Sequence, residues 1–127
     1  MIAKFVKTKV YKVEEDSVIL HDLEDKSSLS IVIDKEQVAS IKQILEKTTM
    51  SRPSTHNLMK DILDNTGLKV SVTTITECRG GTFHSSLKLV NKKEEFFIFD
   101  SRPSDSIAMA LQYGAVIFVD EKLLKSI

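Results

Sequence analysis

The chain has 127 residues, of which 42% are hydrophobic and 28% charged, a composition that excludes disordered and collagen-like chains and fits one folded domain over residues 1–127. Eighteen Lys and Arg balance eighteen Asp and Glu, so no overall positive charge attracts a polyanion, and any contact with nucleic acid must be local. Cys78 is the only cysteine and no apolar run is long enough to span a membrane, which predicts a cytoplasmic protein without an intrachain disulfide.

Three antiparallel strands followed by two amphipathic helices are predicted in the first half of the chain. The strands are indicated by alternating or continuous apolar residues on either side of polar turns. The helices are indicated by apolar residues that recur at intervals of three and four. The predicted strands lie at 3–13, 18–20 and 29–33, and the predicted helices at about 35–48 and around 58–63.

The second half begins again with strands. Runs rich in Val, Thr and Ile surround a hairpin turn, and a short apolar helix then leads to one more strand and a terminal helical turn. The predicted strands lie at 68–78, 82–90, 95–99 and 116–119, the short helix ends at Gly114, and the terminal turn begins at Asp120. The order βββαα-βββαβα, with about four helices, predicts an α+β fold with mixed or antiparallel sheets.

A tetrapeptide occurs twice, each time just before a helical pattern. Residues 51–54 and 101–104 both read Ser-Arg-Pro-Ser and contain both prolines of the chain. Proline favours the first position of a helix, and nearby serines can accept hydrogen bonds from its free N–H groups. Capping does not require arginine, whereas an arginine beside a helix N-terminus can bind phosphate. We therefore take Arg52, Arg102, Ser54 and Ser104 as candidate substrate-binding residues.

Titratable side chains accompany both copies of the tetrapeptide. His56 follows the first copy, and Asp100 and Asp105 flank the second. A histidine in a first helical turn tends to stay neutral and can act as a base, so these three residues are the candidate catalytic residues. The alternative is a purely structural ion-pair cluster formed by Arg52, Arg102, Asp100 and Asp105.

Four motifs resemble those of the bifunctional nuclease domain family. They are Arg-Pro-Ser-Thr-His-Asn-Leu at 52–58, Gly-Thr-Phe at 81–83, Asp-Ser-Arg-Pro-Ser-Asp-Ser-Ile-Ala at 100–108 and Gly-Ala-Val-Ile-Phe-Val at 114–119. The resemblance covers roughly residues 4–123 and is that of a divergent bacterial-type member. It implies an α+β fold, hydrolysis of phosphodiester bonds in DNA and RNA, and a site at Arg52, His56, Asp100, Arg102 and Asp105.

Two carboxylates of many relatives are replaced by amides in this chain. Asn57 stands where they carry Asp, Gln37 where they carry Glu, and Asp34 where they carry Gly. Amide oxygens are weaker ligands of Mg²⁺ than carboxylates. The metal ligands are therefore left unassigned, with a divalent cation such as Mg²⁺ or Mn²⁺ as the candidate cofactor.

Two hypotheses of function follow. In the first, Arg52 and Arg102 hold a nucleic-acid phosphate, Asp100 or Asp105 orients a water or a metal, and His56 moves the proton. In the second, the protein is a non-catalytic oligomeric binding or interaction module with a structural Arg/Asp cluster. A homo-oligomer, most simply a dimer, is expected because the strands at 96–99 and 116–119 carry more apolar side chains than one thin core needs.

Overall fold

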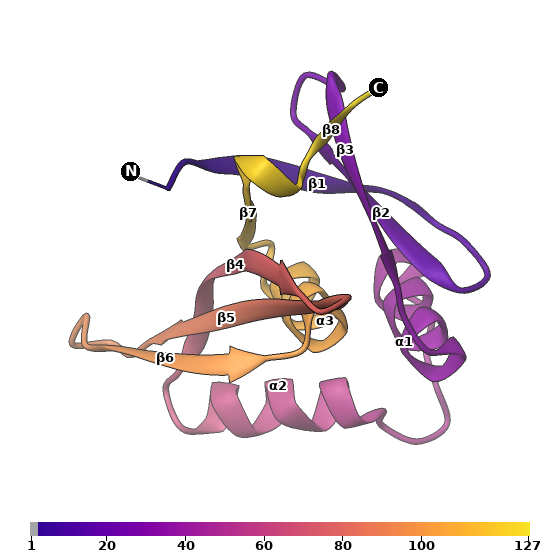
Figure 1. Cartoon of the computed structure of the whole chain (residues 1–127). Coiled ribbons are helices and arrows are strands. Elements are labelled where there is room, and N and C mark those ends of the chain that lie inside the picture. Colours follow the sequence, from indigo (N-terminus) through magenta and orange to yellow (C-terminus); the bar gives the residue numbers. More distant parts are fainter. Residues whose placement is uncertain (1–2) are drawn as a thin grey trace.

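The computed structural model describes residues 3–127, and in that range eight strands form one mixed sheet (Figure 1). The strand order in the sheet is β6-β5-β4-β7-β1-β2-β3-β8. The strands are β1 (Phe5–Val13), β2 (Ser17–Asp22), β3 (Ser27–Val32), β4 (Lys69–Arg79), β5 (Thr82–Val90), β6 (Phe96–Ser101), β7 (Val116–Asp120) and β8 (Lys125–Ser126). The helices are α1 (Lys35–Glu46), α2 (Thr55–Asn65), α3 (Pro103–Tyr113) and the 3-10 turn η1 (Glu121–Leu123). No helix of residues 3–127 is long and apolar enough to cross a membrane.

The α+β fold expected from the sequence is confirmed, except at its end. The terminal helical turn is only η1, because the Asp120 side chain accepts a hydrogen bond from the Lys122 N–H and Leu124 is already extended. Lys125 and Ser126 then pair with β3 as β8. The described residues therefore hold three α-helices and one 3-10 turn, rather than about four helices.

Strand β7 joins the two halves of the sheet. Strands β1 to β3 form one antiparallel meander and β4 to β6 form another. The chain leaves β6, crosses through α3 and returns as β7 between β4 and β1, parallel to β4 and antiparallel to β1. Ile117 and Val119 of β7 are buried in the core, whereas Val116 is 38% exposed and Phe118 is half-buried, so association through β7 stays a prediction.

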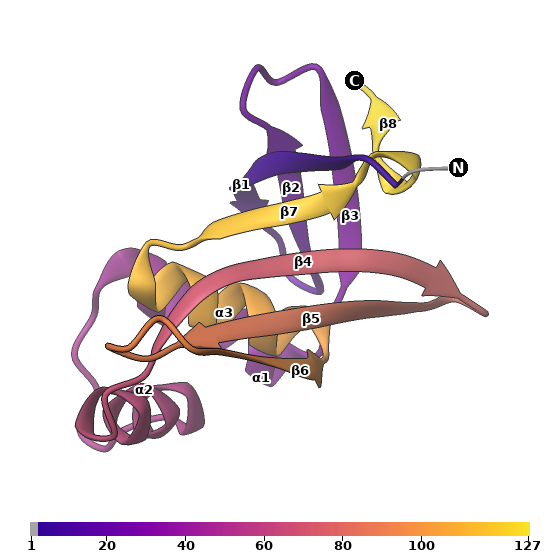
Figure 2. The same cartoon turned by 90° about the vertical axis from the view of Figure 1, so that its left-hand side faces the viewer.

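Helix α3 lies at the centre of the fold. Ile107, Ala108, Met109 and Ala110 are completely buried, because α3 packs against β4 and β5 while α1 and α2 cover it from outside (Figure 2). Met109 belongs to a core cluster with residues of β4 and β5, whereas the other three belong to the larger cluster around β2, β3 and β7. A helix that is apolar on all sides needs such enclosure, and α3 therefore connects both parts of the core.

We expect truncation of α3 to destabilise the protein strongly. Ile107→Ala should lower the free energy of unfolding by about 2–5 kcal/mol, because it leaves a cavity in a closely packed core. Ile62→Ala, at a position of α2 that is 53% exposed, is the matched control and should change it far less. Urea denaturation of both variants measures the difference, and equal losses would contradict the central position of α3.

Candidate functional site

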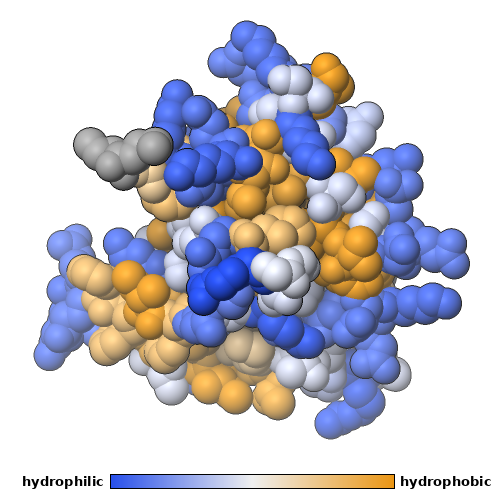
Figure 3. Space-filling model, viewed as in Figure 1, coloured by the Kyte–Doolittle hydropathy of each residue, from blue (hydrophilic) through white to orange (hydrophobic). Residues whose placement is uncertain are grey.

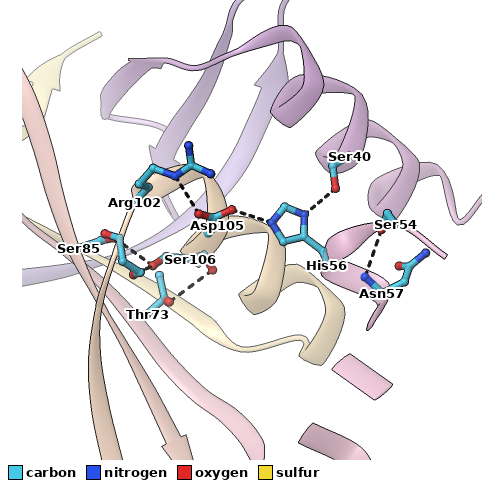
Figure 4. Close-up of polar contacts among 10 residues, drawn as sticks. Ser40, Ser54, His56, Asn57, Thr73, Ser85, Arg102, Asp105 and Ser106 are labelled. Carbon is cyan, nitrogen blue, oxygen red and sulfur yellow. Dashed lines mark hydrogen bonds and ion pairs between the residues drawn. The ribbon is translucent and has the colours of Figure 1, made fainter. Parts of the chain in front are cut away.

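A cluster of hydroxyl groups fixes the junction between β6 and α3. Ser85 of β5 donates a hydrogen bond to the Ser101 carbonyl oxygen at 2.6 Å, and its Oγ lies 2.9 Å from Ser106 Oγ. The Ser101 and Ser106 hydroxyls also contact each other, and Figure 4 shows Ser85 beside Ser106 at this junction. Ser85 and Ser106 are buried, so these bonds satisfy polar groups that water does not reach. The first turn of α3 is thereby held against β5.

Arg102 and Asp105 are the charged residues at this junction. Arg102 precedes the first residue of α3, and its Nε donates to Asp105 Oδ2 at 3.0 Å. Burial acts to raise the pKa of Asp105, but hydrogen bonds from His56 and Arg102 outweigh it, so this pKa lies below its usual value. The hydrogen bond to Asp105 likewise raises the pKa of Arg102. The pair therefore stays ionised, and the Arg102 side chain is still 63% exposed.

His56 connects the three helices from inside the protein. Its Nε2 lies 2.8 Å from Asp105 Oδ1 on α3, and its Nδ1 lies 2.6 Å from Ser40 Oγ on α1. An ionised carboxylate only accepts hydrogen bonds, so Nε2–H donates to Asp105, and in the neutral ring Nδ1 accepts from the Ser40 hydroxyl. The ring is only 4% exposed. Nothing in the sequence around Ser40 indicated this role, because the contact depends on how α1 packs against α2 in the folded protein.

The two Ser-Arg-Pro-Ser copies start their helices in different registers. In the first, Ser54 caps α2 by accepting a hydrogen bond from the Asn57 N–H at 3.1 Å, so Pro53 lies outside the helix. In the second, Arg102 occupies the cap position without a side-chain hydrogen bond, and Pro103 is the first helical residue. The expected proline position is therefore right for Pro103 and wrong for Pro53. Identical tetrapeptides therefore start their helices at different positions, with the serine as the cap in the first copy and the arginine in the second.

A cavity of about 260 Å³ opens at the start of α3. Arg102, Pro103 and Ser104 form one wall. The other lining residues are Asp34, before the start of α1, with the preceding residues 31–33, and residues 81–83 at the β4–β5 hairpin. Within residues 3–127, the N–H groups of Ser104 and Asp105 have no hydrogen-bond acceptor. Two of the four motifs, Gly-Thr-Phe and Asp-Ser-Arg-Pro-Ser-Asp, thus meet at one cavity.

Asp34 is a cavity residue that sequence analysis noted only as a departure from the family pattern and not as a candidate site residue. Its negative charge acts together with Asp105 to raise the pKa of Arg102. A larger cavity of about 700 Å³ lies near the end of α2 and the β5–β6 turn, but it contains none of the motif residues. We therefore place the candidate site at the smaller cavity, where the charged groups converge.

The remaining candidates lie elsewhere. Arg52 and Asp100 are exposed, and neither forms an ion pair within the part of the chain that the structure describes. Of the expected cluster of two arginines and two aspartates, only the Arg102–Asp105 pair is present. Asn57 Oδ1 accepts a hydrogen bond from Gln112 Nε2 at 3.1 Å, away from the cavity. No group of three His, Cys, Asp or Glu side chains among residues 3–127 is arranged to hold a metal ion.

Comparison with known proteins gives the family. Residues 18–127 match the family described as "Bifunctional nuclease domain". The chain belongs to the bifunctional nuclease domain family. The resemblance noted in its motifs is therefore confirmed.

Relatives in this family come from bacteria and plants. An uncharacterized protein of Mycobacterium tuberculosis is 30% identical over 113 residues, which cover 84% of this chain and 63% of that protein. Bifunctional nuclease 1 of Oryza sativa subsp. japonica is 28% identical over 109 residues, which cover 83% of this chain and 33% of the rice protein. The chain thus spans less than two thirds of the length of these curated relatives.

The lowered pKa of Asp105 predicts how stability depends on pH. Because the pKa is lower in the folded state, ionised Asp105 stabilises the protein above the unfolded value of about 4, and this stabilisation is lost as pH falls through the folded value. Asp105→Asn should cost about 1–3 kcal/mol at neutral pH and progressively less in acid. Urea denaturation across pH measures this loss. Asp16→Asn, at an exposed residue without an ion pair among those described, is the control, and an equal pH dependence in both variants would contradict the assignment.

Proposed function

We propose that this protein hydrolyses phosphodiester bonds in DNA and RNA, with the scissile phosphate bound in the cavity at the start of α3. Membership of the bifunctional nuclease domain family supports the reaction class. The proposed position of the phosphate is supported by the exposed Arg102 guanidinium, which lies beside two free N–H groups at the start of α3. Planar guanidinium and helix N-terminal amides are both donors suited to phosphate.

The donors of the proposed phosphate site are gathered at one place, because the chain has no net positive charge that could attract a polyanion by itself. Asp105 accepts a hydrogen bond only from the Nε–H of Arg102, so both Nη groups can still donate to phosphate oxygens. The backbone N–H groups of Ser104 and Asp105 add donors from the first turn of α3. Asp105 and His56 hold Arg102 in place from behind. His56 is therefore a positioning residue in this proposal, because its buried ring lies behind Asp105 and contacts no cavity wall.

Hydrolysis also needs a group that accepts a proton from the attacking water. Asp34 is the carboxylate among the residues that line the cavity together with Arg102, and we assign it this role. Arg102 then neutralises the charge that develops on the phosphate. Arg52 and Asp100 lie outside the cavity and take no part in the proposed step. Ser104 contributes its backbone N–H, while Ser54 is occupied in capping α2.

A divalent cation such as Mg²⁺ or Mn²⁺ fits this arrangement as a bound cofactor. Mg²⁺ in phosphoryl-transfer sites is commonly held by one or two carboxylates together with water and substrate phosphate. Asp34 is the carboxylate among the cavity-lining residues that would hold it, since both oxygens of Asp105 are engaged by His56 and Arg102. Bound there, the cation would supply further charge neutralisation at the phosphate.

The second candidate function is a non-catalytic module that binds an anionic ligand with the same residues. The full engagement of Asp105 by His56 and Arg102 favours it, since an ion pair of this kind also serves a structural role. The two functions differ in whether Asp34 is needed. Binding alone would tolerate its loss, whereas hydrolysis as proposed would not.

Variants of the cavity residues separate the two functions. Asp34→Asn should lower cleavage of end-labelled single-stranded DNA and RNA by about 10²- to 10⁴-fold, as expected when a general base is removed, while binding persists. Cleavage is measured by gel electrophoresis with Mg²⁺ or Mn²⁺ present, and binding by fluorescence anisotropy. Wild-type protein that binds but never cleaves would support the module instead.

Substitution of the two arginines tests the place of binding. Arg102→Lys keeps the charge but loses the planar donor pair, so it should weaken oligonucleotide binding by about tenfold, or roughly 1.4 kcal/mol. Arg52→Lys is the matched control and should bind as the wild type does. Equal effects at both positions, in variants of unchanged melting temperature, would contradict a site at the start of α3.

A further inference from the structure

Strand β6 leaves an apolar edge of the sheet open. Phe96, Phe97, Ile98 and Phe99 are between 46% and 61% exposed, and β6 is the outermost strand beside β5. Hydrophobic side chains gather over the region where β6 lies in Figure 1, as the space-filling view shows (Figure 3). Proteins normally protect a sheet edge with charges or proline. These four positions of β6 have neither.

The backbone pairing shows which residues of β6 face the free edge. The Asn91 N–H donates to the Glu95 carbonyl oxygen at 3.0 Å, and Ser85 donates to the Ser101 carbonyl oxygen. Backbone groups of successive residues point to opposite edges of a strand. The backbone carbonyl groups of residues 95 and 101 point toward β5. The N–H and C=O groups of residues 96, 98 and 100 therefore point toward the free edge. These groups have no partner strand in the described sheet.

Both faces of β6 are apolar, and one continues the protein core. Phe97 and Phe99 are paired with Leu89 and Leu87 of β5, which belong to the buried cluster around Met109. On the other face, the Lys88 ammonium lies 4.5 Å from the centre of the Phe96 ring. The core cluster thus ends at β6 with half-exposed phenylalanines instead of a polar boundary.

We propose that two copies of this chain pair through β6, antiparallel, about a two-fold axis that passes at Ile98. In this register the outward backbone groups of residues 96, 98 and 100 in one copy lie opposite those of residues 100, 98 and 96, respectively, in the other. All three outward residues of each copy are then paired. Phe97 of each copy faces Phe99 of the other, which extends both core clusters across the joint sheet.

Charge complementarity selects this register among its neighbours. Asp100 comes opposite Phe96 of the second copy, next to the Lys88 ammonium that lies over that ring. Neither Asp100 nor Lys88 has an ion-pair partner within residues 3–127 of one copy. An axis at Phe97 would instead bring Glu94 opposite Asp100. Like charges directly opposite each other are destabilising, so that register is disfavoured.

The oligomeric state in solution tests the pairing. Sedimentation velocity of the full chain at micromolar concentration should show twice the 14.3 kDa of one copy. Ile98→Lys places two ammonium groups against each other at the axis and should give a monomer with an unchanged circular dichroism spectrum. Val32→Lys, at a β3 residue that is 77% exposed, is the control and should remain dimeric. A monomeric wild type, or dimeric Ile98→Lys, would overturn the proposal.

Cysteine pairing tests the register itself. In a Cys78→Ser background, Ile98→Cys should form a disulfide-linked dimer with oxidised glutathione, because facing Cα atoms at the axis lie about 5.5 Å apart. Phe97→Cys alone should not cross-link, whereas a mixture of Phe97→Cys and Phe99→Cys should. Cross-linking of Phe97→Cys alone would place the axis elsewhere and overturn the register. Because β6 lies outside the cavity, these results do not depend on hydrolysis.

Discussion

The buried imidazole of His56 is the contact on which the arrangement of the site depends. A buried polar group is costly unless its hydrogen bonds are satisfied, and both nitrogens of His56 find partners on other helices. These two bonds fix α1 and α2 against α3. Through Asp105, the same histidine also orients Arg102 at the mouth of the cavity. One hydrogen-bond network therefore both holds the helices together and positions the candidate phosphate-binding group.

The sequence predicts much of the fold because most elements carry their own pattern. The alternation in β1 and the three-and-four spacing in α1 reflect which side of each element meets the core. In α2 the same spacing is misleading, because Leu58, Met59 and Ile62 stay exposed and only Leu63 packs against the core. Helix α3 begins where Pro103 indicates and ends at Gly114, whose φ of +62° suits glycine. By contrast, β8 exists because β3 has a free edge beside it, a property of the assembled sheet that no local pattern contains.

Part of the candidate site could be proposed from local sequence patterns, and part depends on how the helices pack. The motifs identified Arg102, Asp105 and His56, since local helix chemistry makes those positions conspicuous. They did not identify Ser40 or Asp34, because both act across distances in the sequence that only the packing of α1 closes. Asp100 was a candidate catalytic residue because it directly precedes the second Ser-Arg-Pro-Ser copy in the chain. Strand alternation sends its side chain away from Ser101, and therefore away from the hydroxyl cluster.

The central claim is that a nucleic-acid phosphate binds at the start of α3, and backbone NMR tests it most directly. Two-dimensional ¹H–¹⁵N spectra are recorded while a short phosphorothioate oligonucleotide, which resists cleavage, is added. We expect the largest shifts at the Ser104 and Asp105 amides and at the Arg102 side chain, because these donors would contact the phosphate. Shifts confined to the region of Arg52, or to the larger cavity beside α2, would contradict the account.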